Sequence, residues 1–365
     1  MSERQRASMN TLLMQIKPTT PRQTINTVIL VMSIIAAIVF PWVVDSALVG
    51  VGLVALIYAM RNFTWNIAGG LAGMLSLAHV AAYGIGAFAV AILTWGHGIS
   101  VWIAIMIGMV LSGLVGIAIS LIMSRFGVNA FFFALGTAAL ALAISGIAAS
   151  WSVTGKVNGL QNNTSGEGFA QLQWFLDPKP LYYVALVMLM LIVVLTAWMT
   201  SRTRLGRSLP FIREDPDMAS SMGIDVVRNQ ALAMGLSMAL TAIPGSLIAL
   251  YTSFVSYESV LTLEIGILMV VGAIIGGSST LAGPIVAGIG IAALEEGLRS
   301  FDVTSSSVSS ATQIIYAAVV ILILRLGSDG IVPMWNALLD RLLPVRESAD
   351  EDPLPESLER ESEHA

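Results

Sequence analysis

Long apolar runs, separated by short polar segments, cover most of the chain. Several runs approach or exceed the roughly 20 residues with which a helix crosses a bilayer, and the period-two alternation of a membrane β-barrel is absent. The pattern predicts an all-α polytopic membrane protein with about ten transmembrane helices. The predicted spans are residues 25–44, 47–63, 71–95, 101–124, 130–151, 181–199, 231–254, 261–277, 284–298 and 311–326.

Two segments within this pattern are dense in glycine, residues 66–79 and residues 272–284. Such segments can let two helices pack closely, with Gly69 and Gly73 on one helix face. They can also be breaks in a helix, which a membrane tolerates only where the backbone is buried or lines a cavity. Residues 261–298 are correspondingly either two short crossings or one broken element.

The broken-helix interpretation places a polar pathway beside both glycine-rich segments. His79 is the one titratable side chain well inside the first of them, although it can also be a packed residue bonded to a neighbouring carbonyl. We expect residues 69–79 to line the pathway near the middle of the membrane. The candidate pathway residues are Asn66, Gly69, Gly70, Gly73, Met74, Ser76, His79, Gly276, Gly277 and Gly283.

Residues 201–228 form the most charged segment between apolar runs. They contain nine charged side chains, whereas residues 24–200 contain seven. Charge at a bilayer centre costs about 2.5–3.5 kcal/mol per residue, so this segment must lie in water.

A short amphipathic helix is predicted in the middle of this charged segment. Asp215 and Pro216 favour its start, and Gly223 favours its end. Such a helix suits docking to a soluble partner, or it is a solvated element that packs only on its own protein. Its apolar side contains Met218, Ala219 and Met222.

The lysines and arginines orient the chain. If the N-terminus is cytoplasmic, fifteen of the eighteen fall on the cytoplasmic side, with Arg61 among them. Both termini are then cytoplasmic. Residues 347–365 carry eight acids and one arginine, and we expect them to be disordered. The predicted layout is a cytoplasmic segment at 1–24, a transmembrane domain at 25–326 with an extracellular loop at 152–180 and a cytoplasmic segment at 201–228, and a cytoplasmic tail at 327–365.

The sequence offers little for catalysis. There is no cysteine, and the three histidines show no metal-ligand spacing. No phosphate-binding loop and no serine nucleophile motif occur. We therefore expect no enzyme activity, metal, cofactor or nucleic-acid partner, and any ATP-driven transport needs a partner ATPase. An ion-coupled transporter or a channel remains an alternative, and its buried acids would have to be Glu264, Glu295 or Glu296.

Four stretches resemble the LivM type of branched-chain amino acid ABC transporter permeases. Residues 66–86 are similar to that family's signature, and residues 154–160 to its extracellular turn. Residues 204–224 resemble its cytoplasmic coupling loop, and residues 268–284 its second glycine-rich block. The resemblance covers about residues 47–326.

This resemblance implies a permease subunit of an importer in the cell membrane, surrounded by lipid. A homologous second permease subunit, two ATP-binding cassette ATPase subunits and an extracytoplasmic solute-binding protein would be its partners. The transported solute would be a branched-chain, aliphatic amino acid or a related small polar molecule. The residues that would couple to the ATPases are Arg207, Arg213, Glu214, Asp215, Ala219, Met222 and Gly223.

The chain departs from the family pattern at several positions. Met74 stands where the family usually has glutamine, and Ala78 where it usually has glycine. Because the same family also moves urea and short amides, the change at Met74 leaves the solute open.

Overall fold

The computed structural model describes residues 21–125, 130–162, 168–173, 177–278, 280–300 and 330–335. Residues 36–334 form one compact unit, and residues 1–35 together with 335–365 form another. The predicted N-terminal segment up to residue 20, the predicted last span and the acidic tail lie outside the described residues. The layout and orientation predicted for them stay predictions.

The described chain is almost entirely helical, which confirms an all-α polytopic membrane protein. Six helices are long and apolar enough to cross a membrane, and two apolar helices are shorter. The expected count of ten is not decided, because residues 311–326 are not described. The helices are α2 (Pro21–Val43), α3 (Ser46–Asn66), α4 (His79–Val90), α5 (Val101–Arg125), α6 (Ala130–Ser150), α7 (Lys179–Arg202), α8 (Arg204–Glu214), α9 (Pro216–Ser221), α10 (Val226–Thr252), α11 (Tyr257–Val260), α12 (Leu263–Gly276) and α13 (Gly283–Ser300).

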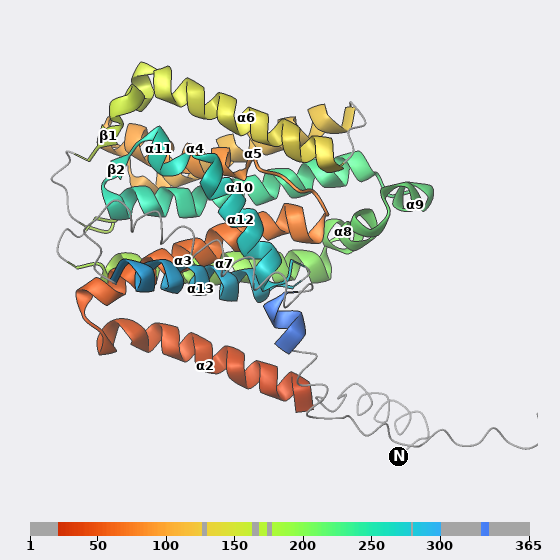
Figure 1. The fold of residues 1–365 in the computed structure, drawn as a ribbon, viewed down its shortest axis with the longest axis horizontal. Helices are drawn as coiled ribbons and strands as arrows, with labels where there is room; N and C mark the ends of the chain where they lie inside the picture. Colours follow the sequence, from red (N-terminus) through yellow and green to blue (C-terminus); the bar gives the residue numbers. More distant parts are fainter. Residues whose placement is uncertain are drawn as a thin grey trace, which may run out of the picture. The chain divides into compact units, whose positions relative to one another are not determined.

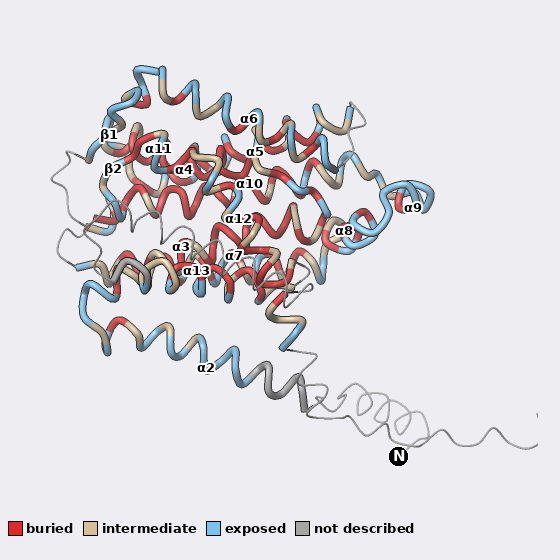
Figure 2. The backbone as a smooth tube through the Cα atoms, in the orientation of Figure 1, coloured by how far each residue is buried: buried red, intermediate tan, exposed pale blue. Residues whose placement is uncertain are grey.

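Helix α10 lies at the centre of the main unit and packs against α3, α4 and α5 (Figure 1). In an 18-residue apolar stretch of α10, 78% of the residues are buried, whereas in the corresponding stretch of α6 only 22% are buried. Figure 2 shows the same contrast, with buried residues concentrated on α3, α4 and α10. The apolar side chains that α5, α6 and α7 expose are suited to contact with lipid or another subunit.

Side-chain caps fix where several helices begin. Thr203, Asp215 and Asp225 each accept a hydrogen bond from a backbone N–H in the first turn that follows. These contacts satisfy N–H groups that have no partner inside a helix. The charged segment is therefore divided into α8, α9 and the start of α10.

A small sheet closes one end of the main unit. Strand β1 (Leu160–Gln161) pairs antiparallel with β2 (Phe254–Val255), with Leu160 opposite Val255. Just before β1, the Thr154 hydroxyl donates to the Ala148 carbonyl at 2.6 Å. The turn that was expected to be extracellular is thus attached to the C-terminal end of α10.

Candidate functional site

The first glycine-rich segment is a break between two helices. Helix α3 continues as a π-helical turn over Ile67–Leu71, residues 72–78 are not helical, and α4 begins at His79. The prediction of one continuous span over residues 71–95 was therefore wrong, and of the two interpretations of this segment the structure shows the helix break. Gly73 has a left-handed φ of +73° beyond the helix end, so it cannot share a helix face with Gly69.

Hydrogen bonds hold this break in a defined shape. The Met74 N–H donates to the Ala68 carbonyl at 2.9 Å. The Trp65 indole N–H donates to the Ser76 carbonyl at 2.7 Å. Ser76 is fully buried and Met74 is 6% exposed. The non-helical backbone is therefore partly enclosed by protein, while Gly73 and Leu75 are exposed and line a cavity; irregular backbone within a membrane domain occurs where it is buried or lines a cavity.

The second glycine-rich segment is also a helix break. Helix α12 ends at Gly276 and α13 begins at Gly283, and the two helices pack against each other and against α3. A Cβ added at Gly276 would overlap the backbone of Gly283. Gly277 has a φ of +107°, which favours glycine. Residues 261–298 therefore contain two separate helices joined by a tight, glycine-dependent turn.

The two helix breaks contact each other. The Asn66 amide Nδ2 donates to the Thr280 carbonyl at 3.0 Å across a sequence separation of 214 residues. A Cβ added at Gly70 would overlap the Ser278 carbonyl oxygen and the Asn66 side chain. Only glycine at position 70 allows this approach, so the structure brings together pathway candidates from both segments.

The charged segment forms the short helix that the sequence predicts. The Asp215 carboxylate accepts from the N–H groups of Asp217 and Met218 at the start of α9, and Gly223 has a φ of +82° just after it. Ala219 is fully buried, whereas Met218 is 63% exposed. The expected coupling residues that are exposed are Arg207, Arg213, Glu214, Asp215, Met222 and Gly223.

Helix α8 contacts the first helix break directly. The Arg213 guanidinium donates from Nη1 to the Gly70 carbonyl at 2.9 Å. A Cβ added at Gly73 would lie 3.2 Å from the Arg213 Cα. The charged segment and both glycine-rich segments therefore form one junction, defined here by residues 66–78, 276–278, 280–283 and Arg213. We call it the glycine junction.

A cavity of about 550 Å³ opens between the glycine junction, α8 and the start of α10. Gly73 and Met74 line it together with Arg213 and Gln230. Gly70 lies at the end of a 26-residue helical run, and Gly73 lies just beyond it. At 1.5 Å per residue that run is about 39 Å long, and the depth of the pathway in the membrane stays a prediction.

His79 takes part in a buried network with α3 and α10. Its Nε2 lies 2.8 Å from the Ser237 hydroxyl oxygen, and that hydroxyl donates to the Thr64 carbonyl at 2.6 Å. Because the single hydroxyl hydrogen of Ser237 is used by Thr64, the His79 Nε2 carries the hydrogen and donates. His79 is fully buried and does not line the cavity. The sequence suggested a bond from His79 to a neighbouring carbonyl, and in the structure its Nε2 bonds this hydroxyl.

Arg61 was expected near the end of its span, at the cytoplasmic side, but the structure encloses it inside the protein. Arg61 lies inside α3, is 3% exposed, and is the only charged side chain buried in the described part of the chain. Its guanidinium carbon lies 3.6 Å from the centre of the Tyr58 ring. The next residue, Asn62, is fully buried. An isolated arginine within an apolar run could have indicated a buried charge. The prediction missed it because the span was expected to end at residue 63, two residues after Arg61.

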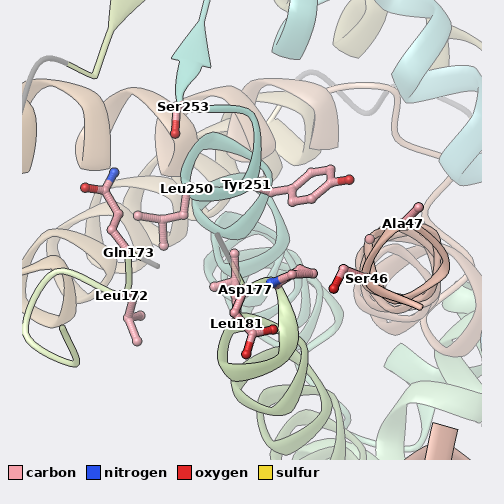
Figure 3. Close-up of a pocket in the computed structure, with 11 residues that line it drawn as sticks. Ser46, Ala47, Leu172, Gln173, Asp177, Leu181, Leu250, Tyr251 and Ser253 are labelled. Atoms are coloured by element: carbon pink, nitrogen blue, oxygen red, sulfur yellow. The ribbon is translucent and has the colours of Figure 1, made fainter. Parts of the chain in front are cut away.

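A second cavity lies at the opposite end of α3 and α10 (Figure 3). It measures about 290 Å³. Helix α3 contributes Ser46 to its wall, α10 contributes Tyr251, and Asp177 precedes α7. Helices α3 and α10 therefore connect two cavities at the two ends of the main unit.

Comparison with known proteins identifies the family. A family profile described as "Branched-chain amino acid transport system / permease component" matches residues 47–324. The LivM permease of the high-affinity branched-chain amino acid transport system of Escherichia coli K12 is 24% identical over 333 residues, which cover 85% of this chain and 76% of the relative. The corresponding protein of Salmonella typhimurium LT2 is 23% identical over 84% of this chain and 75% of the relative. No solved structure gives a significant match. The chain belongs to the family of branched-chain amino acid transport permease components.

Proposed function

We propose that this chain is a permease subunit of an ABC importer and forms part of the path for branched-chain, aliphatic amino acids. Separate ATPase subunits supply the energy, since the sequence has no phosphate-binding loop. The observation that carries the proposal is the contact between Arg213 on the charged segment and Gly70 at the helix break. It connects a surface that can meet a soluble ATPase with the irregular backbone inside the membrane domain.

The coupling surface is formed by α8 and α9. Met218 and Met222 expose apolar side chains there, at 63% and 55% exposure, beside the charges of α8. Flexible methionine side chains adapt to an apolar groove on a partner. When the ATPases close, rigid-body movement of α8 would pull on Gly70 through Arg213 and change the packing of the two helix breaks.

The other partners follow from the family. A homologous second permease subunit would cover part of the exposed apolar surface, with lipid covering the rest. A solute-binding protein would dock at residues 152–180, which contain both signs of charge at Lys156, Glu167, Asp177 and Lys179. Charges of both signs favour steered association that weakens as salt is added.

Ion coupling is disfavoured by the placement of the acids. Glu264 is exposed, and Glu295 and Glu296 are partly exposed. Among the described residues no acidic side chain is fully buried. A secondary transporter uses buried ionisable groups along its route, so ATP remains the better-supported energy source.

The solute is assigned as an aliphatic amino acid for two reasons. Both relatives named above are permeases of branched-chain amino acid transport systems. In addition, Met74 gives the cavity beside the glycine junction an apolar wall where the family usually has glutamine. An apolar wall favours an aliphatic side chain over urea.

Reconstitution tests this function. The chain would be co-expressed with its second permease subunit and its ATPase subunits and placed in proteoliposomes with the binding protein. We expect uptake of radiolabelled leucine that requires ATP and the binding protein. Preferred uptake of urea would contradict the assigned solute. Uptake that persists without the ATPase subunits would contradict the importer itself.

A further inference from the structure

We propose that Arg61, together with Asn62 and Asn66, forms a site within the membrane domain that binds the charged end of the transported amino acid. Arg61 would bind the carboxylate, and the amide oxygens would accept from the ammonium group. This inference rests on the proposed function and names the residues that recognise the solute. The expected pathway candidates included Asn66 but neither Arg61 nor Asn62.

The guanidinium of Arg61 has unused donors. Neither Nε nor Nη2 has a hydrogen-bond partner, although both are buried. These two N–H groups form one edge of the guanidinium and can bind both oxygens of a carboxylate in parallel. The aromatic neighbours, Tyr58 through its ring and Tyr83 through its hydroxyl, carry no charge that could neutralise Arg61. A buried arginine without a counter-ion is unfavourable, so an anionic ligand would complete the site.

Asn62 and Asn66 add unpaired groups on the next face of α3. Both side-chain polar atoms of Asn62 lack a partner, and so does the Oδ1 of Asn66. The Nδ2 of Asn66 is used by Thr280. Buried amides without partners are uncommon, because burial removes their bonds to water without replacing them. Five unpaired polar atoms therefore lie within six consecutive residues of one helix.

The second glycine-rich helix leaves space for Asn62. A Cβ added at Gly272 of α12 would overlap the Asn62 amide nitrogen. Glycine at position 272 therefore allows α12 to approach the unpaired amide. The same α12 continues to Gly276 at the glycine junction, so a movement transmitted through the junction reaches a helix that covers the site.

The position of Arg61 suits an occluded binding site. The cavity of about 290 Å³ includes Gly50 of α3, and the cavity of about 550 Å³ begins at Ala72. At 1.5 Å per residue, Arg61 lies about 16 Å along the chain from each of these two residues. Neither cavity includes Arg61 among its lining residues. In alternating access the solute would bind at such a midpoint while both sides are closed.

A photoreactive diazirine analogue of leucine tests the site. The assembled transporter, reconstituted in nanodiscs without the binding protein, would be irradiated with the analogue during ATP turnover, and labelled peptides would be mapped by mass spectrometry. Without the binding protein, any selectivity belongs to the permease. We expect the analogue to label α3, α4 or α12 near Arg61. An excess of leucine should suppress this labelling, whereas leucinamide, which lacks the carboxylate, should not. Labels confined to other helices, or equal suppression by leucinamide, would overturn the proposal.

Variants separate recognition from folding. Arg61→Gln should reduce labelling by at least about tenfold, because a bidentate charge-assisted contact is lost. Arg61→Lys keeps the charge without the two parallel donors and should retain part of the labelling. The matched control is Arg125→Gln, at the exposed end of α5, which should label as the wild type does. If Arg61→Gln does not assemble, the Arg61→Lys variant and the positions labelled in the wild type still test whether the solute binds near Arg61.

The outcomes distinguish this inference from the proposed function. If the wild type imports leucine with ATP while Arg61→Gln and Arg61→Lys import it with unchanged KM and kcat, the site is wrong and the function stands. If the wild type imports no leucine, the function itself fails.

Discussion

Gly70 illustrates how much one residue decides in this protein. Its missing side chain lets the carbonyl of Ser278 and the side chain of Asn66 come close, and its own carbonyl accepts from Arg213. One backbone position thus contacts the second helix break and the charged segment. Gly73 and Gly277 act differently, because their positive φ values need glycine whatever the space around them.

We expect Gly70→Ala to destabilise the protein by about 1–3 kcal/mol, the usual effect of overpacking a closely packed position. The added Cβ would overlap a backbone oxygen, which cannot move as freely as a side chain. Thermal unfolding of the purified complex measures the change. Gly146→Ala is the control, because it lies on the exposed face of α6 with no atom within 4 Å of the added Cβ. An equal effect of both substitutions would show that the contact at Gly70 is not close.

The Ser237 hydroxyl joins three helices, so its removal tests the buried network. In Ser237→Ala the His79 Nε2–H loses its partner, and the Thr64 carbonyl loses one of its two donors and keeps the Ile67 N–H. We expect a loss of about 1–3 kcal/mol of unfolding free energy, the cost of unpaired buried groups. Ser201→Ala removes an exposed hydroxyl at the end of α7 and should change little. Unchanged melting of Ser237→Ala would contradict the network.

At the scale of elements, helix breaks and short helices carry the specific features, while the long apolar helices provide the frame. Helix α3 is extended by a π-helical turn over Ile67–Leu71, a feature often found at functional sites. Helix α8 lies beside that turn through Arg213. The proposed coupling surface and the proposed pathway are therefore formed by neighbouring elements.

Arg213→Ala should uncouple ATP hydrolysis from transport. The variant loses the donor to the Gly70 carbonyl but leaves α8 otherwise intact, since alanine favours helix. We expect ATP hydrolysis to persist while leucine uptake per ATP falls. Arg204→Ala, at the exposed start of α8, is the matched control. Normal uptake per ATP in Arg213→Ala would exclude this contact from coupling.

Gly223→Ala tests the turn after α9. The substitution places a side chain at a φ of +82° with no neighbour within 4 Å. The expected cost is therefore backbone strain of about 1–2 kcal/mol, without a packing defect. Gly223→Asn should cost less, because asparagine adopts this conformation more readily. Fluorescence-monitored unfolding measures the stability of both variants, and uptake per ATP measures their coupling. A lower stability of Gly223→Ala than of Gly223→Asn would show that backbone strain matters at this turn.

At the scale of the molecule, two cavities lie at opposite ends of α3 and α10, with the polar residues of α3 between them. The exposed α9 lies at the end that contains the larger cavity (Figure 1). The difference between the two ends fits the proposed importer, in which solute enters at one end and the ATPases move α8 and α9 at the other.

A cysteine at position 221 tests the orientation of this arrangement. Ser221 is exposed on α9, so Ser221→Cys should keep the fold. In a background that has no native cysteine, we expect this thiol to cross-link to the co-expressed ATPase and to resist membrane-impermeant reagents applied to intact cells. Labelling from outside would place the charged segment on the wrong side of the membrane.

Sequence patterns alone predicted several elements correctly. Apolar run length predicted membrane helices because the bilayer thickness sets their length. Asp215, Pro216 and Gly223 predicted a short helix because capping and turn preferences are local. Dense glycine indicated either close helix packing or broken helices, and the structure shows breaks after Leu71 and after Gly276.

Three-dimensional packing decided the rest. Whether Gly73 extends a helix or ends it, whether Arg61 lies in water or inside α3, and what pairs with His79 depend on residues far away in the sequence. The sequence determined which segments are apolar, which are charged and where helices can break, because these are properties of nearby residues. Only the tertiary structure placed both glycine-rich segments and Arg213 at one junction, because their contacts join positions up to 214 residues apart that no local preference relates.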